Sequence, residues 1–184
     1  MKLIETALPG VVILEPDIYS DARGFFLESY HRERFADLGI TAEWVQDNHS
    51  RSTRGTLRGL HFQPGFPQAK LCRVVAGEVL DVAVDVRRGS PHFGQWTSAL
   101  LSAENKRQIF IPRGFAHGFL VLSECAEFLY KCDDYYHAHD ERGIAWNDAD
   151  LGIAWNIENP ILSVKDQTNP RLRDCAELPI FQQP

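Results

Sequence analysis

Short β-type segments separated by turn signals fill the middle of the chain, and they constrain the fold more than any other feature. Residues 71–86 alternate apolar and polar side chains around Gly77, which predicts two strands or one bent strand. Further strands are expected at 96–101, 108–112, 118–122 and 126–132, with turn-forming residues between them. Many short strands at near-regular spacing are typical of an all-β sandwich or barrel.

The segments before and after this region have residue patterns that are not typical of strands. A helix is predicted over residues 31–38 and is ended by Gly39. Proline and asparagine are scattered through the C-terminal third, which is expected to wrap the barrel in loops and short helices. Because the sequence has no repeat, low-complexity tract or linker, we predict one domain over residues 1–184 with a wrapping C-terminal segment.

Composition excludes several classes of protein. The 184 residues carry a net charge of −6, which argues against a nucleic-acid or membrane-surface partner. No apolar run approaches the length of a bilayer-spanning helix, and Glu5 interrupts any signal-peptide core, so a cytoplasmic location is expected. The four cysteines form no CxxC pair and are expected to be free, mostly buried thiols.

A run of cations interrupts this acidic composition. Residues 49–77 contain no Asp or Glu, yet they include the cations Arg51, Arg54, Arg58, Lys70 and Arg73. Arginine suits phosphate because its planar guanidinium makes paired hydrogen bonds. A solvated loop with surface ion pairs is an equal alternative for the run alone, but its glycines and His61 favour a phosphate-bearing small molecule.

A second motif lies at residues 112–119, where Pro112, Gly114 and His117 form a PxGxxH pattern before a strand. This pattern resembles the second half of the cupin signature, which implies a jelly-roll barrel, or double-stranded β-helix. Most cupins bind a metal through an HxH pair, a Glu and this His. Here the first pair reads His61-Phe62-Gln63, so one imidazole is replaced, and we expect no metal.

His61 is then a candidate general base. Such a base needs a carboxylate to fix its tautomer, and Asp166 is a plausible distant partner. Tyr130 lies in an alternating segment and by itself fits a core tyrosine. Tyr135 and Tyr136 fit either surface aromatics or a ligand-stacking pair.

Eight motifs in register resemble one family. They are the segments 21–28, 46–50, 57–63, 68–71, 112–119, 127–131, 141–148 and 162–166. In this order they are similar to the dTDP-4-dehydrorhamnose 3,5-epimerase family of nucleotide-sugar epimerase cupins, from about Leu3 to Leu172.

The resemblance implies an isomerase that needs no cofactor. Its substrate would be dTDP-4-dehydro-6-deoxy-α-D-glucose, epimerised at C3 and C5, both next to the C4 ketone. By resemblance His61 is the base, Asp166 orients it, and Tyr130 is the acid on the opposite face. Lys70 would stabilise the enolate at the C4 oxygen.

The resemblance also implies a binding set and a homodimer with strand exchange near the N-terminus, so that some ligands come from the partner. Arg23, Arg58 and Lys165 would hold the diphosphate and nucleotide, and Tyr136 would stack on thymine. The remaining expected pocket residues are Phe26, Glu28, Gln46, Asp47, Asn48, His117 and Glu141.

Three other functions stay open at this point. A relative that epimerises only C3 or only C5 would use the same base and acid. A metal-dependent cupin is the rival from a different class. A catalytically dead binder of sugar nucleotides is the third, although His61, Tyr130 and Asp166 together argue against it.

Overall fold

The computed structural model describes residues 1–182 and is built mainly from strands. The strands are β1 (Lys2–Glu5), β2 (Val12–Glu15), β3 (Ile18–Asp21), β4 (Gly24–Leu27), β5 (Gln46–Thr53), β6 (Leu57–Phe62), β7 (Lys70–Ala76), β8 (Glu78–Asp85), β9 (Trp96–Ser102), β10 (Gln108–Ile111), β11 (Phe115–Val121), β12 (Cys125–Cys132) and β13 (Arg142–Gly143). One short α-helix, α1 (Arg32–Asp37), and one 3₁₀ turn, η1 (Leu172–Asp174), complete the elements.

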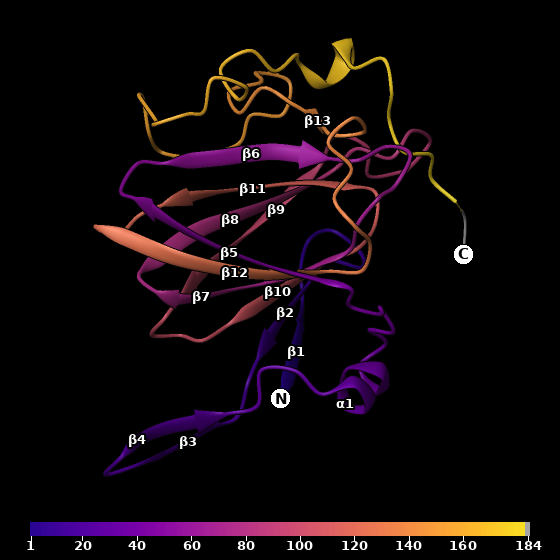
Figure 1. The fold of residues 1–184 in the computed structure, drawn as a ribbon. Helices are drawn as coiled ribbons and strands as arrows, with labels where there is room; N and C mark the ends of the chain where they lie inside the picture. Colours follow the sequence, from indigo (N-terminus) through magenta and orange to yellow (C-terminus); the bar gives the residue numbers. More distant parts are fainter. Residues whose placement is uncertain (183–184) are drawn as a thin grey trace.

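Two antiparallel sheets face each other and form the body of the molecule (Figure 1). The first has the strand order β1-β2-β10-β7-β12-β5, and the second has the order β13-β6-β11-β8-β9. Strands that are distant in sequence are therefore neighbours in each sheet. This arrangement confirms the predicted all-β jelly-roll barrel with few helices.

The segment 71–86 forms two strands, β7 and β8, because Gly77 breaks it. Gly77 has φ +74°, and a Cβ there would lie 2.0 Å from the carbonyl oxygen of Cys125. Only glycine tolerates this conformation and this contact. The turn sends β7 into one sheet and β8 into the other.

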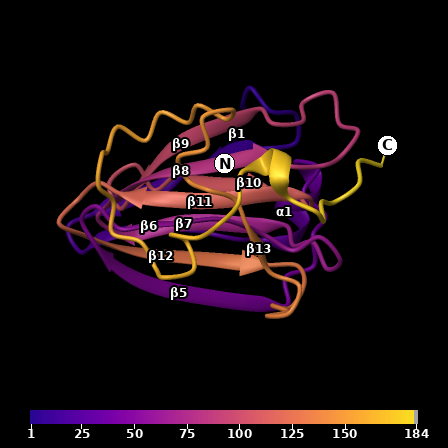
Figure 2. The same cartoon turned by 90° about the horizontal axis from the view of Figure 1, so that it is seen from above.

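Three apolar clusters fill the molecule. The first lies between the sheets and includes Ile109 and Phe128 from one sheet and Leu101 from the other. The second lies on the outer face of the β13-β6-β11-β8-β9 sheet, which the C-terminal segment covers (Figure 2). Trp155 of that segment is part of this cluster. The third packs α1 against the outer face of the other sheet through Phe35. The C-terminal segment thus covers the outer face of one sheet.

The β3–β4 hairpin differs from the rest because it projects from the body (Figure 1). Its strands pair only with each other. The exposed fractions of Tyr19, Phe25 and Phe26 are 65%, 60% and 68%. Isolated two-stranded hairpins are marginal in water, so these aromatic rings need another surface to cover them.

All four cysteines are free, as expected, but only Cys72 and Cys132 are buried, whereas Cys125 and Cys175 are partly exposed. No helix in residues 1–182 has the length and apolar character needed to cross a bilayer.

Candidate active site

A cavity of about 670 Å³ opens between the two sheets. Polar side chains from both sheets and from the C-terminal segment line it. Of the residues predicted from sequence, those that line it are Gln46, Asn48, Arg58, His61, Lys70, His117, Tyr130, Tyr136, Glu141 and Asp166. The volume lies within the range of small-molecule sites.

One wall of the cavity carries the predicted base, His61, near the end of β6. Its Nε2 lies 2.6 Å from Oδ1 of Asp166, which confirms the predicted contact across 105 residues. The ionised carboxylate accepts the proton of Nε2, so in the neutral ring Nδ1 keeps its lone pair. Nδ1 has no protein partner among residues 1–182, and it is therefore free to act on a ligand.

The environment of Asp166 keeps this carboxylate ionised. Burial by itself would raise its pKa, because charge is costly away from water. The hydrogen bond and positive charge of His61, with a further hydrogen bond from Ser163, outweigh burial and hold the pKa of Asp166 below its usual value. The C-terminal segment thereby places a charged partner against His61.

The opposite wall carries Tyr130 on β12 and Lys70 on β7. Burial, helped by the neighbouring Cys132 and Cys72, raises the pKa of Tyr130 to about 12. The phenol therefore keeps its proton in neutral solution and can donate it. Lys70 places its ammonium 6.0 Å from the Tyr130 ring centroid and has no carboxylate partner within residues 1–182. An acid and an unpaired cation thus lie across the cavity from His61.

A second imidazole–carboxylate pair lies deeper in the β13-β6-β11-β8-β9 sheet. Nε2 of His117 is 2.9 Å from Oδ2 of Asp81, and both side chains are buried. The other oxygen of Asp81, Oδ1, is buried without a hydrogen-bond partner within residues 1–182. We did not predict a role for Asp81 from sequence. A signal was present, because it is the one charge within the apolar run 79–84.

Close packing of β6 against β11 brings the two pairs together. His61 and His117 are register partners on these strands. Gly59 has φ +121°, and a Cβ there would lie 2.5 Å from Cα of Gly118. A side chain at Gly59 would force the strands apart and would displace both imidazoles.

One group in residues 1–182 has spacing compatible with a metal ion. Donor atoms of Cys72, Asp81 and His117 lie within 4.8 Å of one another. Burial and the charge of Asp81 raise the pKa of the Cys72 thiol well above its usual value, which works against its thiolate form. This group is not the HxH-based set of metal cupins, because His61 belongs to Asp166 and Gln63 replaces the second imidazole of that pair.

A polar cluster forms the rim of the cavity around Tyr136. Its hydroxyl donates to Oε2 of Glu141 at 3.1 Å, and its main-chain N–H donates to Oε1 of Gln46 at 3.0 Å. The same oxygen of Glu141 accepts a hydrogen bond from Lys165. Lys165 therefore contacts the rim, although it does not itself line the cavity. About half of Tyr136 stays exposed, so one face of its ring is available.

The structure divides the predicted cationic run. Arg58 and Lys70 line the cavity, whereas Arg51 pairs with Glu127 on the outside. Arg54 and Arg73 do not line the cavity either. Arg73 lies three residues after Lys70 on the same strand. Because side chains alternate along a strand, the two point to opposite faces, and Arg73 points away from the cavity. The structure therefore brings only two of the five cations of this run to the cavity.

Four predicted residues lie outside this chain's own cavity. The hairpin carries Arg23 and Phe26 away from the body, and Glu28 follows it and pairs with Arg34. Arg23 pairs with Asp21 instead. Alternation turns Asp47 to the outer face of β5, where it accepts hydrogen bonds from Lys131 at 2.9 and 3.1 Å.

The comparison with protein families agrees with this geometry. A family model described as dTDP-4-dehydrorhamnose 3,5-epimerase matches residues 5–174. The chain belongs to this family. A dTDP-4-dehydrorhamnose 3,5-epimerase from Pseudomonas aeruginosa is 54% identical over 181 residues, covering 97% of this chain and 100% of the relative.

Solved structures of family members share the fold. A dTDP-6-deoxy-D-glucose-3,5-epimerase from Legionella pneumophila, in complex with dTDP-4-keto-L-rhamnose, is 52% identical. The TM-score is 0.95, and 99% of each chain is covered. A 3′-monoepimerase from Streptomyces bikiniensis, in complex with dTDP-quinovose, is 36% identical with a TM-score of 0.89, covering 95% of this chain and 91% of that one. The epimerase fold therefore accommodates both double and single epimerisation.

Proposed function

We propose that this chain, acting as one domain over residues 1–184, epimerises dTDP-4-dehydro-6-deoxy-α-D-glucose at C3 and C5 and yields dTDP-4-dehydro-β-L-rhamnose. One observation carries the proposal: a carboxylate-oriented imidazole and a protonated phenol face each other from opposite sheets across one cavity. Inversion at carbon requires a base on one face of the sugar and an acid on the other. The membership of the family supports the substrate.

The first step is proton removal by Nδ1 of His61. The carbon–hydrogen bond breaks, its electron pair moves toward the C4 ketone, and an enolate forms. Asp166 holds the ring by Nε2 and stabilises the imidazolium that results. His61 is 28% exposed, so its new proton can exchange with solvent.

The second step is protonation from the other wall. The phenol of Tyr130 donates its proton to the opposite face of the enolate carbon, and the configuration inverts. Lys70 supplies the charge that the enolate oxygen needs during this interval. After the first inversion His61 releases its proton to solvent and the Tyr130 phenolate takes one up, which restores both groups. A ring flip or rotation of the sugar then presents the second carbon, so the same pair acts at C3 and at C5.

Binding of the nucleotide uses the rim. Arg58 offers its guanidinium to the diphosphate and also donates from Nε to Ser52 at 3.0 Å. Lys165 and Glu141 close the side near Tyr136, whose exposed ring stacks on thymine. Gln46, Asn48 and His117 supply polar contacts inside.

The working unit in this proposal is a homodimer. The exposed rings of the β3–β4 hairpin support an exchange of this hairpin between two copies of the chain. Each hairpin would then bring Arg23, Phe26 and Glu28 to the cavity of the other copy.

A mixing experiment tests the shared site. Arg23→Ala and His61→Asn should each be inactive, or nearly so, when purified alone. After subunit exchange, the mixed dimer holds one site with both native residues, so part of the wild-type activity should return. Two inactive variants that stay inactive in a verified mixed dimer would contradict the exchange of hairpins.

Proton NMR of the substrate in D2O tests the reaction itself. Deuterium should enter at both C3 and C5, and the L-configured product should accumulate. Deuterium at one carbon alone would instead support the second candidate, a single epimerase, which the likeness to the 3′-monoepimerase makes specific. Activity that depends on a bound metal and is lost with a chelator would support a metal cupin.

A further inference from the structure

The side chain of Gln63 has no role in the proposed chemistry, yet it is only 5% exposed and lines the cavity. It stands two residues after His61, where metal cupins carry their second histidine. A buried amide needs partners for its two N–H groups and its oxygen. The hydrogen-bond partners of the Gln63 amide therefore indicate the role of this side chain in the present fold.

All three partners are main-chain groups of two irregular segments. Nε2 donates to the carbonyl oxygen of Phe66 at 2.7 Å and to that of Tyr135 at 3.3 Å. Oε1 accepts from the N–H of His137 at 2.8 Å. Residues 64–69 and 133–141 contain no strand, so these bonds replace the missing ladder.

Other contacts join the same two segments. The buried carboxylate of Asp140 accepts from the N–H groups of Gly65 at 3.0 Å and Phe66 at 2.8 Å. The Phe66 ring stacks on His137 with centroids 4.2 Å apart. The two segments are thus held as one unit at the mouth of the cavity.

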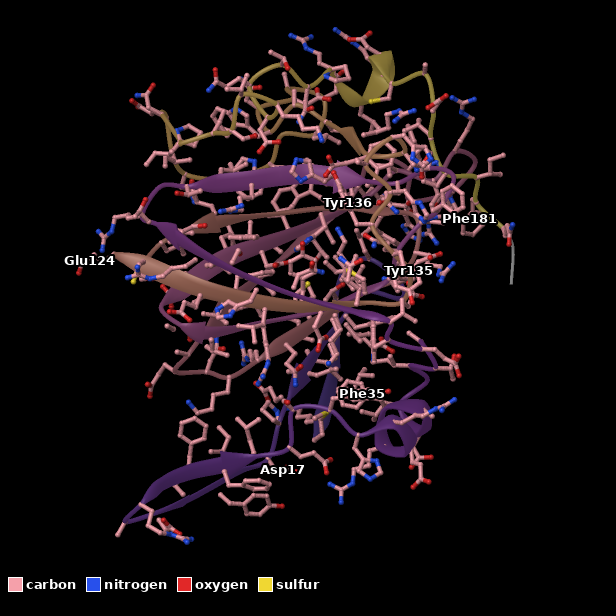
Figure 3. The ribbon with its side chains drawn as sticks, in the orientation of Figure 1. Asp17, Phe35, Glu124, Tyr135, Tyr136 and Phe181 are labelled. Carbon is pink, nitrogen blue, oxygen red and sulfur yellow. The ribbon has the colours of Figure 1, made fainter. Side chains whose placement is uncertain are left out.

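Tyr136 lies between the two residues that Gln63 holds in its own segment, Tyr135 and His137. Figure 3 shows Tyr135 and Tyr136 close together at the end of the molecule opposite Glu124. The main chain on both sides of Tyr136 is therefore fixed by one buried side chain. Bonds to Gln46 and Glu141 fix the residue itself.

We infer that Gln63 is a positioning residue for nucleotide recognition: it holds Tyr136 in place to stack on the base. This inference rests on the proposed function, because it assumes a thymidine nucleotide at the rim. Loss of the Gln63 amide should weaken binding of the base. Proton transfer at His61 and Tyr130 should continue once substrate is bound.

Inhibition by dTDP and by inorganic pyrophosphate separates the two parts of the ligand. In Gln63→Leu the inhibition constant of dTDP should rise about 5- to 100-fold, the range for loss of one base–aromatic stack. The constant for pyrophosphate should not change, and kcat at saturating substrate should stay within about threefold of wild type because no reacting group is altered. Gln95→Leu removes an exposed amide outside the cavity and should change neither constant.

A double-mutant cycle tests whether Gln63 acts through Tyr136. Tyr136→Ala should raise the dTDP constant by a similar factor, and the double variant should lose no more than either single one. Gln63→Glu is the alternative test if the leucine variant does not fold. Its carboxylate still accepts from the N–H of His137, but it cannot donate to the carbonyl oxygens of Phe66 and Tyr135 and repels them. Its dTDP constant should rise in the same direction.

Three results would overturn the inference. They are equal loss of dTDP and pyrophosphate binding, additive losses in the cycle, or unchanged dTDP binding in folded Gln63 variants. If wild-type protein itself failed to bind dTDP, the proposed function would fall instead, so the two failures are distinguishable.

Discussion

His61–Asp166 and His117–Asp81 are built from the same two chemical groups, and their histidines are register partners on the adjacent strands β6 and β11. They differ in exposure: the imidazole of His61 is 28% exposed, whereas that of His117 is 7% exposed. They also differ in origin, because Asp166 arrives on an irregular C-terminal segment and Asp81 lies within the strand next to its partner.

The difference teaches what each pair is suited to do. A ring with access to water can take a proton from substrate and pass it to solvent. A ring enclosed in the sheet, with a fully buried carboxylate behind it, is held in one place. We therefore assign proton transfer to the first pair and fixed binding of the substrate to the second.

The largest effect should come from His61→Asn. This change removes the base and leaves a polar group of similar size, so kcat should fall by about two to four powers of ten. The same change at His117 should lower kcat far less and raise KM, as expected for a binding group. Steady-state kinetics of the two variants make the comparison. Equal losses of kcat would contradict the assignment.

Asp166→Asn should have the next largest effect. In our proposal it removes the charge that stabilises the His61 imidazolium, and kcat should fall by about two powers of ten, the lower end of the range for general acid–base catalysis. Because the pKa of Asp166 is lowered in the folded protein, its charge stabilises the fold above the unfolded-state pKa of about 4, and this stability is lost as pH falls through the folded pKa. Urea unfolding at pH 7 and pH 3 should show the wild-type advantage over Asp166→Asn shrinking at the lower pH.

Asp81→Asn should produce a smaller effect of another kind. Its carboxylate reaches the cavity only through His117, so we expect about a tenfold rise in KM with kcat little changed. Cys72→Ala is the matched control, since Cys72 lies beside Asp81 and makes no hydrogen bond with it. A loss in Cys72→Ala equal to that in Asp81→Asn would indicate a packing effect rather than the carboxylate.

The smallest expected signal is a single step in a spectroscopic titration, and it concerns Tyr130 on the opposite wall. Because burial raises its pKa to about 12, Tyr130 should ionise only in strongly alkaline solution. A spectroscopic alkaline titration should therefore lose a step near pH 12 in Tyr130→Phe. Loss of a step near pH 10 instead would mean that the buried wall does not retain the phenolic proton.

Sequence predicted the strands between residues 71 and 132 well, because alternation reflects one buried and one exposed face. It missed β5, whose residues 46–53 are almost all polar although alternate positions are shielded. Hydrophobicity carries no signal there, because alternate side chains of this strand line a polar cavity. The hairpin strands β3 and β4 were missed because neither face is buried in this chain.

Site residues that belong to recognisable sequence motifs could be predicted. Residues whose role depends on how they pack in the folded chain could not. The pairing of His61 with Asp166 was predicted, although 105 residues separate them. Asp81 and Gln63 take their roles from burial, which depends on how strands and loops meet. Alternation along a strand predicts that Lys70 and Arg73 point to opposite faces, so part of the division of the cationic run is readable from the sequence.

The most direct test follows deuterium and configuration together in Tyr130→Phe and His61→Asn. If His61 removes the proton and Tyr130 returns one from the other wall, Tyr130→Phe should still exchange substrate protons with D2O while epimerisation stops. His61→Asn should lose both exchange and epimerisation. Exchange at the wild-type rate in folded His61→Asn would contradict the central claim that His61 and Asp166 form the proton-abstracting pair.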